Sequence, residues 1–169
     1  MGAPWLHLAL FFRLNGPAEG VPTALPHGHC PDYAECAMSI RILIIDEHPS
    51  AREMLARRLG SRPDMDVVDA TGDAEAGLRR IKELHPDVVL LDIKMHRADG
   101  VEVCRRACAV ANGARVAILT SYSEPAERRM ARQAGAQGYL LKEVDTPKLA
   151  RWIKRLVGIP EDEADSFRV

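Results

Sequence analysis

Three acidic side chains, one hydroxyl and one lysine stand where they could bind a metal ion and react with phosphorus. Asp46 and Glu47 follow one run of aliphatic residues, and Asp92 follows another. Thr120 and Lys142 each follow a further run. Clustered carboxylates repel one another unless a cation compensates them, and an open oxygen site that keeps several waters suits Mg²⁺. With Mg²⁺ and a lysine to neutralise the entering oxygens, an aspartate can act as a nucleophile toward phosphorus.

The aliphatic runs predict the strands that would bring these side chains together. Each run holds four or five residues with little polar alternation, which is typical of strands buried on both faces of a parallel sheet. The five predicted strands are Arg41–Ile45, Asp66–Ala70, Val88–Leu91, Arg115–Leu119 and Gly138–Leu141.

The stretches between the runs carry the apolar spacing of amphipathic helices. Asp73 is a suitable cap for the second helix, and Pro125 in a first turn begins the fourth. The last helix, opened by Thr146 and Pro147, is the clearest, because five of its apolar residues fall on one face: Leu149, Trp152, Ile153, Leu156 and Val157. Strict alternation of strands and helices predicts an open, doubly wound α/β sheet with right-handed crossovers. Ligands of such sheets bind at the carboxyl ends of the strands, where the polar residues stand.

Charge and composition narrow the class of protein. The 169 residues include 23 Lys and Arg and 24 Asp and Glu, a net charge of −1 that argues against a general nucleic-acid binder. No apolar run approaches the ~18–20 residues that span a bilayer, so we expect no membrane insertion. Four cysteines are too few for a disulfide scaffold, which favours a reducing, cytoplasmic setting.

The chain divides into three parts. Residues 1–37 are rich in proline and glycine and are interpreted as a disordered leader or a start-site extension, because a second methionine, Met38, precedes the first regular segment. Residues 38–157 carry the alternating pattern, and residues 158–169 form a short acidic tail. Four possible metal ligands in the leader fit no standard zinc spacing: His27, His29, Cys30 and Cys36.

The segment Met38–Val157 resembles the receiver domain of two-component response regulators. The resemblance covers about 120 of the 169 residues. It rests on several motifs together: Ile42-Leu-Ile-Ile-Asp-Glu-His-Pro49, Pro86-Asp-Val-Val-Leu-Leu-Asp-Ile-Lys-Met95, Asp99-Gly100, Ile118-Leu-Thr-Ser-Tyr122 and Gly135-Ala-Gln-Gly-Tyr-Leu-Leu-Lys142. The first and last look like the receivers that usually precede a NarL-type helix-turn-helix domain. The resemblance implies a flavodoxin-like, CheY-like fold with strand order 2-1-3-4-5 and helices on both faces.

The resemblance also implies a phosphoacceptor and a metal site. Asp92 would receive a phosphoryl group from a histidine kinase or phosphotransfer protein and become 4-aspartylphosphate. Asp46 and Glu47 would hold Mg²⁺ together with Asp92 and the backbone carbonyl of Lys94. The protein would then be a phosphoprotein of a phosphorelay rather than an enzyme with its own substrate, although it takes part in its own phosphorylation and dephosphorylation.

The remaining family roles concern the switch. Thr120 would move toward the phosphoryl group, Lys142 would contact it, and Tyr139 would move inward behind Thr120. These movements would alter the face of the fourth helix, fifth strand and fifth helix, where an unknown downstream protein or a second phosphorylated copy would bind.

Two departures from the family pattern qualify this expectation. His96 stands where a proline is usual, which leaves the third loop less defined. The tail has no room for a helix-turn-helix domain and is acidic, so we expect a stand-alone receiver without direct nucleic-acid binding.

Three alternatives stay open. The chain could bind partners without phosphorylation, although the complete set of site residues speaks against that. It could be a fragment of a longer DNA-binding regulator. It could also be an aspartyl-phosphate phosphatase, but those enzymes carry an Asp-x-Asp motif after the first strand, whereas the candidate nucleophile here follows the third.

Overall fold

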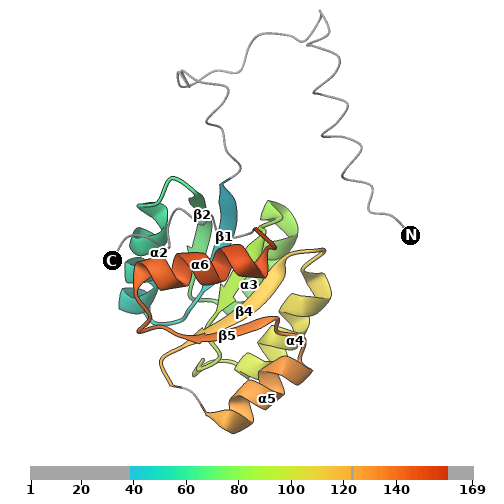
Figure 1. The fold of residues 1–169 in the computed structure, drawn as a ribbon. Coiled ribbons are helices and arrows are strands. Elements are labelled where there is room, and N and C mark those ends of the chain that lie inside the picture. The colour runs from blue at the N-terminus through green and yellow to red at the C-terminus, as the bar shows by residue number, and fades with distance from the viewer. Residues whose placement is uncertain (1–38, 123, 160–169) are drawn as a thin grey trace, which may run out of the picture. The chain divides into compact units, whose positions relative to one another are not determined.

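A five-stranded parallel sheet with helices on both faces forms the part of the chain that the computed structural model describes, residues 39–122 and 124–159 (Figure 1). The strand order is β2-β1-β3-β4-β5, as the family resemblance implied. The strands are β1 (Ile40–Ile45), β2 (Met65–Thr71), β3 (Val88–Leu91), β4 (Arg115–Thr120) and β5 (Gly138–Leu141). The helices are α2 (Pro49–Gly60), α3 (Ala74–Leu84), α4 (Gly100–Val110), α5 (Pro125–Gln133) and α6 (Thr146–Leu156).

These boundaries confirm the predicted alternation. Two strands coincide with the predicted runs, and the other three differ from them by one residue at one or both ends. The interpretation of residues 1–37 as a leader lies outside the described residues, as does the acidic tail after Ile159. Within the described ranges, no helix is both long and apolar enough to cross a membrane.

Two hydrophobic layers hold the helices against the sheet. Helices α3, α4 and α5 pack on one face through residues such as Leu78, Val103 and Ala131. Helices α2 and α6 cover the other face through residues such as Leu59 and Ile153. Figure 1 shows α6 lying across its face of the sheet. Because both faces are covered, the central strands β1, β3 and β4 are almost fully buried.

The outer strands are less buried than the sequence predicted. The expectation of strands buried on both faces is wrong for β2 and β5, most of whose residues are only partly covered. Leu141 at the end of β5 is 37% exposed. The reason is that both strands lie at an edge of the sheet, where one neighbouring strand is missing.

Side-chain caps fix where several helices begin. Asp73 accepts a hydrogen bond from the Ala76 amide at 2.6 Å, which confirms it as the cap of α3. Asp99 caps α4. The cap of α6 is Asp145, one residue before the predicted opening, and it accepts from the Lys148 amide at 2.8 Å. The caps of α4 and α6 end the loops that begin with Asp92 and Lys142, two of the candidate site residues.

Candidate functional site

The polar residues predicted at the strand ends do lie along one edge of the sheet. Asp46 directly follows β1, Asp92 follows β3, Thr120 is the last residue of β4, and Lys142 follows β5. These four strands are consecutive neighbours in the sheet. Parallel strands end at the same edge, so side chains that are up to 96 positions apart in sequence meet there.

Backbone hydrogen bonds extend the ladder beyond the strands and hold these residues in register. The Asp92 amide donates to the carbonyl of Ile45 at 2.9 Å, and the Lys142 amide donates to the carbonyl of Thr120 at 2.8 Å. The Asp46 carbonyl accepts from Arg52 Nη1 at 2.6 Å. Hydrogen bonds therefore hold the main chain of Asp46, Asp92 and Lys142 in place.

Lys142 lies between the two buried carboxylates. Its Nζ is 2.6 Å from Oδ2 of Asp46 and 2.6 Å from Oδ2 of Asp92. Asp46 is 1% exposed and Asp92 3%, so neither carboxylate is hydrated as it would be at a surface. A buried pair of like charges needs a counter-ion, and the ammonium group supplies one positive charge to the two acids.

Backbone amides orient the other oxygens of the same carboxylates. Oδ1 of Asp92 accepts from the Lys94 amide at 3.0 Å, and Oδ1 of Asp46 accepts from the His48 amide at 3.0 Å. The Lys94 side chain instead forms ion pairs with Glu124 and Glu127. The hydrogen bonds that the Lys94 ammonium donates to Glu127 and then to Glu124 raise the pKa of Lys94. Lys94 therefore contributes its backbone to the site, and its ammonium group is engaged with α5 and the residue before it.

Thr120 and Tyr139 occupy neighbouring strands without a hydrogen bond between them. Thr120 is fully buried, and its Oγ1 has no hydrogen-bond partner among the described residues. The hydroxyl of Tyr139, which is partly buried, donates to the carbonyl of Tyr122 at 3.3 Å. Burial, followed by the negative charge of Glu127, raises the pKa of Tyr139. An unpaired buried hydroxyl at the edge of the site is available to a group that arrives there.

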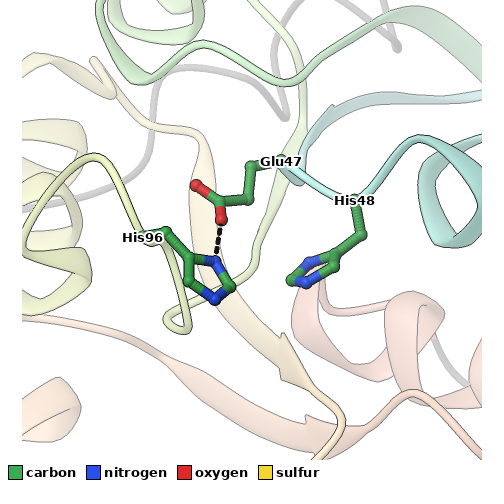
Figure 2. A group of neighbouring side chains, drawn as sticks. All are labelled: Glu47, His48 and His96. Atoms are coloured by element: carbon green, nitrogen blue, oxygen red, sulfur yellow. Dashed lines mark hydrogen bonds and ion pairs between the residues drawn. The ribbon is translucent and has the colours of Figure 1, made fainter.

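Glu47 lies with two histidines, which the sequence did not predict to meet (Figure 2). Nδ1 of His96 contacts Oε1 of Glu47 closely, although the His96 side chain is 78% exposed. Hydrogen bonds from the backbone and then the ring of His96 lower the pKa of Glu47. Nδ1 of His48 lies 3.5 Å from Oδ1 of Asp46 and 3.6 Å from Oδ2 of Asp92. His48 stood in the first family motif, but its sequence position alone did not show what it would face.

The donor atoms of the site fit a hard divalent cation. Oxygens of Asp46, Glu47 and Asp92 are present, and oxygen is the donor that Mg²⁺ prefers. Oε2 of Glu47 is buried and has no hydrogen-bond partner among residues 39–122 and 124–159, which leaves a carboxylate oxygen free to bind an ion. The possible ligands form two groups that share His48: Glu47 belongs to one with His96, and Asp46 and Asp92 belong to the other.

Comparison with known proteins identifies the family of this arrangement. The profile of the response regulator receiver domain matches residues 42–154. Transcriptional regulatory protein LiaR of Bacillus subtilis is 35% identical over 115 residues, which are 68% of this chain and 54% of LiaR. The DNA-binding transcriptional activator DevR/DosR of Mycobacterium tuberculosis is 33% identical over 115 residues, 68% of this chain and 53% of the activator. This chain thus spans about half the length of these curated relatives.

A solved structure agrees with the sequence relatives. The signal receiver domain of the response regulator NarL from Mycobacterium tuberculosis superposes with a TM-score of 0.66 at 32% identity, and the match covers 71% of this chain and 97% of that domain. A LuxR-family two-component response regulator from Aurantimonas gives a TM-score of 0.65 at 32% identity, over 70% of this chain and 85% of the other. Since profile, relatives and fold agree over the segment that carries the strand-end residues, this chain belongs to the response regulator receiver domain family, in its NarL-like subtype.

Proposed function

We propose that Asp92 accepts a phosphoryl group from a histidine kinase or phosphotransfer protein, in a Mg²⁺-dependent reaction that switches the binding of a downstream partner. The observation that carries this proposal is the position of Lys142, whose ammonium group lies 2.6 Å from both Asp46 and Asp92. A buried aspartate beside a lysine and further acids is suited to accept a phosphoryl group, because the charge of the incoming oxygens is compensated.

In this proposal the cation is held by Asp46, Glu47, Asp92 and the backbone carbonyl of Lys94. When bound, Mg²⁺ supplies positive charge to the phosphoryl oxygens and to the crowded carboxylates. The unpartnered Oε2 of Glu47 supports its assignment as a ligand.

The transfer itself needs only a small change at Asp92. One carboxylate oxygen of Asp92 forms the new bond to phosphorus, while the bond from phosphorus to the donor's histidine nitrogen breaks and that nitrogen keeps the electron pair. The Lys142 ammonium, now paired with Oδ2 of Asp92, can then pair with a phosphoryl oxygen. The hydroxyl of Thr120, which has no hydrogen-bond partner among the described residues, can turn toward the same group.

The proposed partner-binding surface is formed by α5, β5 and α6. It includes the edge of the sheet at which β5 lies. Movement of Thr120 would leave room for Tyr139 to turn inward, which would break its hydrogen bond to the Tyr122 carbonyl and free the loop between β4 and α5. A downstream protein, or a second phosphorylated copy, would recognise the altered face.

Intact-mass analysis with acetyl phosphate tests the proposal. The full chain is incubated with and without Mg²⁺, next to the variant Asp92→Asn. We expect a hydroxylamine-labile phosphoryl adduct on the wild type only, and only with Mg²⁺. A folded wild-type protein that binds Mg²⁺ but gains no adduct would overturn phosphorylation and favour a receiver that binds its partners without it.

A second candidate is the receiver part of a longer DNA-binding regulator. The observation that favours it is that the named relatives are transcriptional regulators and that this chain spans only about half of their length. The mass of the protein isolated from its native source distinguishes the two. A mass that matches these 169 residues or fewer supports a stand-alone receiver, whereas a mass nearer twice that value supports the longer regulator.

A further inference from the structure

Two imidazole rings and one carboxylate converge at the end of β1 (Figure 2), where Nδ1 of His48 lies 3.6 Å from Oδ2 of Asp92. Glu47 and His48 follow β1, and His96 comes from the loop between β3 and α4. One ligand atom of each residue lies within 4.8 Å of the other two. The rings of His48 and His96 are 5.7 Å apart between centroids, with an angle of 65° between their planes, so they are not stacked on each other.

The chemistry of the two histidines differs from that of the carboxylates of Asp46 and Asp92. Carboxylate oxygens suit Mg²⁺, whereas imidazole nitrogens suit Zn²⁺ and other later transition metals. Two histidines with one carboxylate form a three-ligand set that leaves a fourth tetrahedral position for water. From these residue types and their convergence, we propose that Glu47, His48 and His96 bind a divalent transition-metal ion of the zinc class.

The geometry requires only small side-chain movements. Bonds of about 2.0–2.1 Å in a tetrahedral zinc site place neighbouring ligand atoms about 3.4 Å apart. Atoms at the 4.8 Å limit need to approach by about 1.5 Å, whereas Nδ1 of His96 and Oε1 of Glu47, already in close contact, need to separate. The side chains of His48 and His96 are 47% and 78% exposed, so both rings have room to turn. The Glu47 side chain is only 14% exposed, so it has the least room to move of the three ligands.

Two further observations favour a cation site here. Oε2 of Glu47 is buried and unpartnered among the described residues, although Oε1 already contacts His96. His48 also belongs to a second group of possible ligands, with Asp46 and Asp92, whose atoms again lie within 4.8 Å of one another. The histidines therefore extend the acidic site outward, and a transition metal bound there would be next to Asp92.

Glu47 is a ligand in both the proposed zinc site and the proposed magnesium site, so zinc binding would regulate phosphorylation. This consequence rests on the proposed function. Because one carboxylate would serve both ions, occupation by Zn²⁺ would oppose Mg²⁺ binding and so slow phosphorylation of Asp92. Replacement of His96 would remove this inhibition and leave the proposed Mg²⁺ ligands in place.

Zinc binding to the full chain tests the proposal directly. Zn²⁺ is titrated, at one fixed pH near neutrality, against the protein in competition with a chromophoric chelator. The variants are His96→Asn and, as the matched control, His85→Asn. His85 is exposed and caps α3 before β3 begins, so it lies toward the amino ends of the strands, and its left-handed backbone (φ 47°) tolerates asparagine. A third variant replaces the possible ligands of the leader: His27, His29, Cys30 and Cys36.

We expect His96→Asn to weaken zinc binding by more than about tenfold, because loss of even a supporting residue commonly costs that much. His85→Asn and the leader variant should keep the wild-type affinity of this site. Histidine-ring NMR signals of His48 and His96, but not of His85, should shift when Zn²⁺ is added. Equal affinity in the wild type and His96→Asn, or ring signals that do not move, would overturn the proposal and leave the contact with Glu47 as an ordinary hydrogen bond.

Phosphorylation provides a separate readout of the consequence. At a fixed Mg²⁺ concentration, added Zn²⁺ should slow adduct formation on the wild type more than on His96→Asn. If acetyl phosphate modifies neither protein, the proposed function fails while the zinc titration still decides the metal site. If both are modified and Zn²⁺ slows them equally, the regulatory consequence is wrong.

Discussion

The ammonium group of Lys142 and the carboxylate of Asp92, 50 residues apart in sequence, lie 2.6 Å apart at the carboxyl edge of the sheet. The lysine side chain is 11% exposed and the aspartate side chain 2%, so water screens this ion pair weakly. The same ammonium compensates Asp46. The Lys142 ammonium thus offsets the repulsion between two buried acids, and the stability of this edge depends on it.

Replacement of Lys142 by methionine should lower the free energy of unfolding by about 3 kcal/mol without Mg²⁺, because two buried carboxylates lose their counter-ion. Addition of Mg²⁺ should restore much of the loss, since the ion would take over the compensation. Urea unfolding with and without Mg²⁺ measures both effects. The control Lys148→Met removes a lysine whose side chain is 67% exposed, and it should cost less than about 1 kcal/mol. Similar losses in the two variants would contradict the proposed dependence.

Thr120→Val should stabilise the protein by about 1 kcal/mol, because it replaces a fully buried, unpartnered hydroxyl by a methyl group of similar shape. The matched control is Thr71→Val at the end of β2, where the hydroxyl accepts a hydrogen bond from the Asp73 amide at 3.2 Å. That variant should lose stability. Urea midpoints of both variants provide the comparison, and a destabilised Thr120→Val would show that this hydroxyl does have a partner in solution.

Gly100→Ala should destabilise the protein by more than about 2 kcal/mol, through overpacking. A Cβ at this first residue of α4 would lie 2.0 Å from the carbonyl oxygen of Ile93, a backbone atom that cannot turn away. Relief of the clash must move the loop that carries His96, so zinc binding should weaken too. Gly60→Ala, at the end of α2, meets nothing within 4 Å and should be neutral or slightly stabilising. Thermal unfolding of the two variants tests the contrast, which equal melting temperatures would refute.

Asp64 should contribute stability that disappears at low pH. Hydrogen bonds from Arg62 and then Lys154 lower its pKa from 3.8 to about 2. The folded state thus favours the charged form, so the contribution is complete above the unfolded pKa and is lost as the pH falls toward the folded one. Screening at this partly solvated site reduces it to about 1 kcal/mol.

Urea unfolding of the wild type and Asp64→Asn at several pH values isolates this contribution. The wild type should be more stable by about 1 kcal/mol near neutrality, and the difference should shrink between about pH 4 and pH 2. Lys154 joins Asp64 from α6 at 2.8 Å, so Lys154→Met should reduce the pH dependence in part. A stability difference that is the same at every pH would show that the carboxylate charge is not the cause.

Much of the fold could be predicted because its signals are local. Runs such as Val88–Leu91 have the length and composition of buried strands, and Asp73 is a helix cap by its own side-chain chemistry. The placement of Asp46, Asp92 and Lys142 at strand ends followed from the same pattern, since parallel strands share one carboxyl edge.

The tertiary structure decided what depends on neighbours far along the chain. The exposure of Leu141 results from the position of β5 at an edge, which no residue within β5 specifies. Likewise, the meeting of His96 with Glu47 depends on the path of a loop that begins 47 residues after β1 ends. The sequence by itself determined which residues form strands and helices and which strand ends are polar, because hydrophobic spacing acts over a few residues. Which side chains contact one another at the carboxyl edge was decided only by the packing of the whole sheet, because these contacts join residues that are far apart in the sequence.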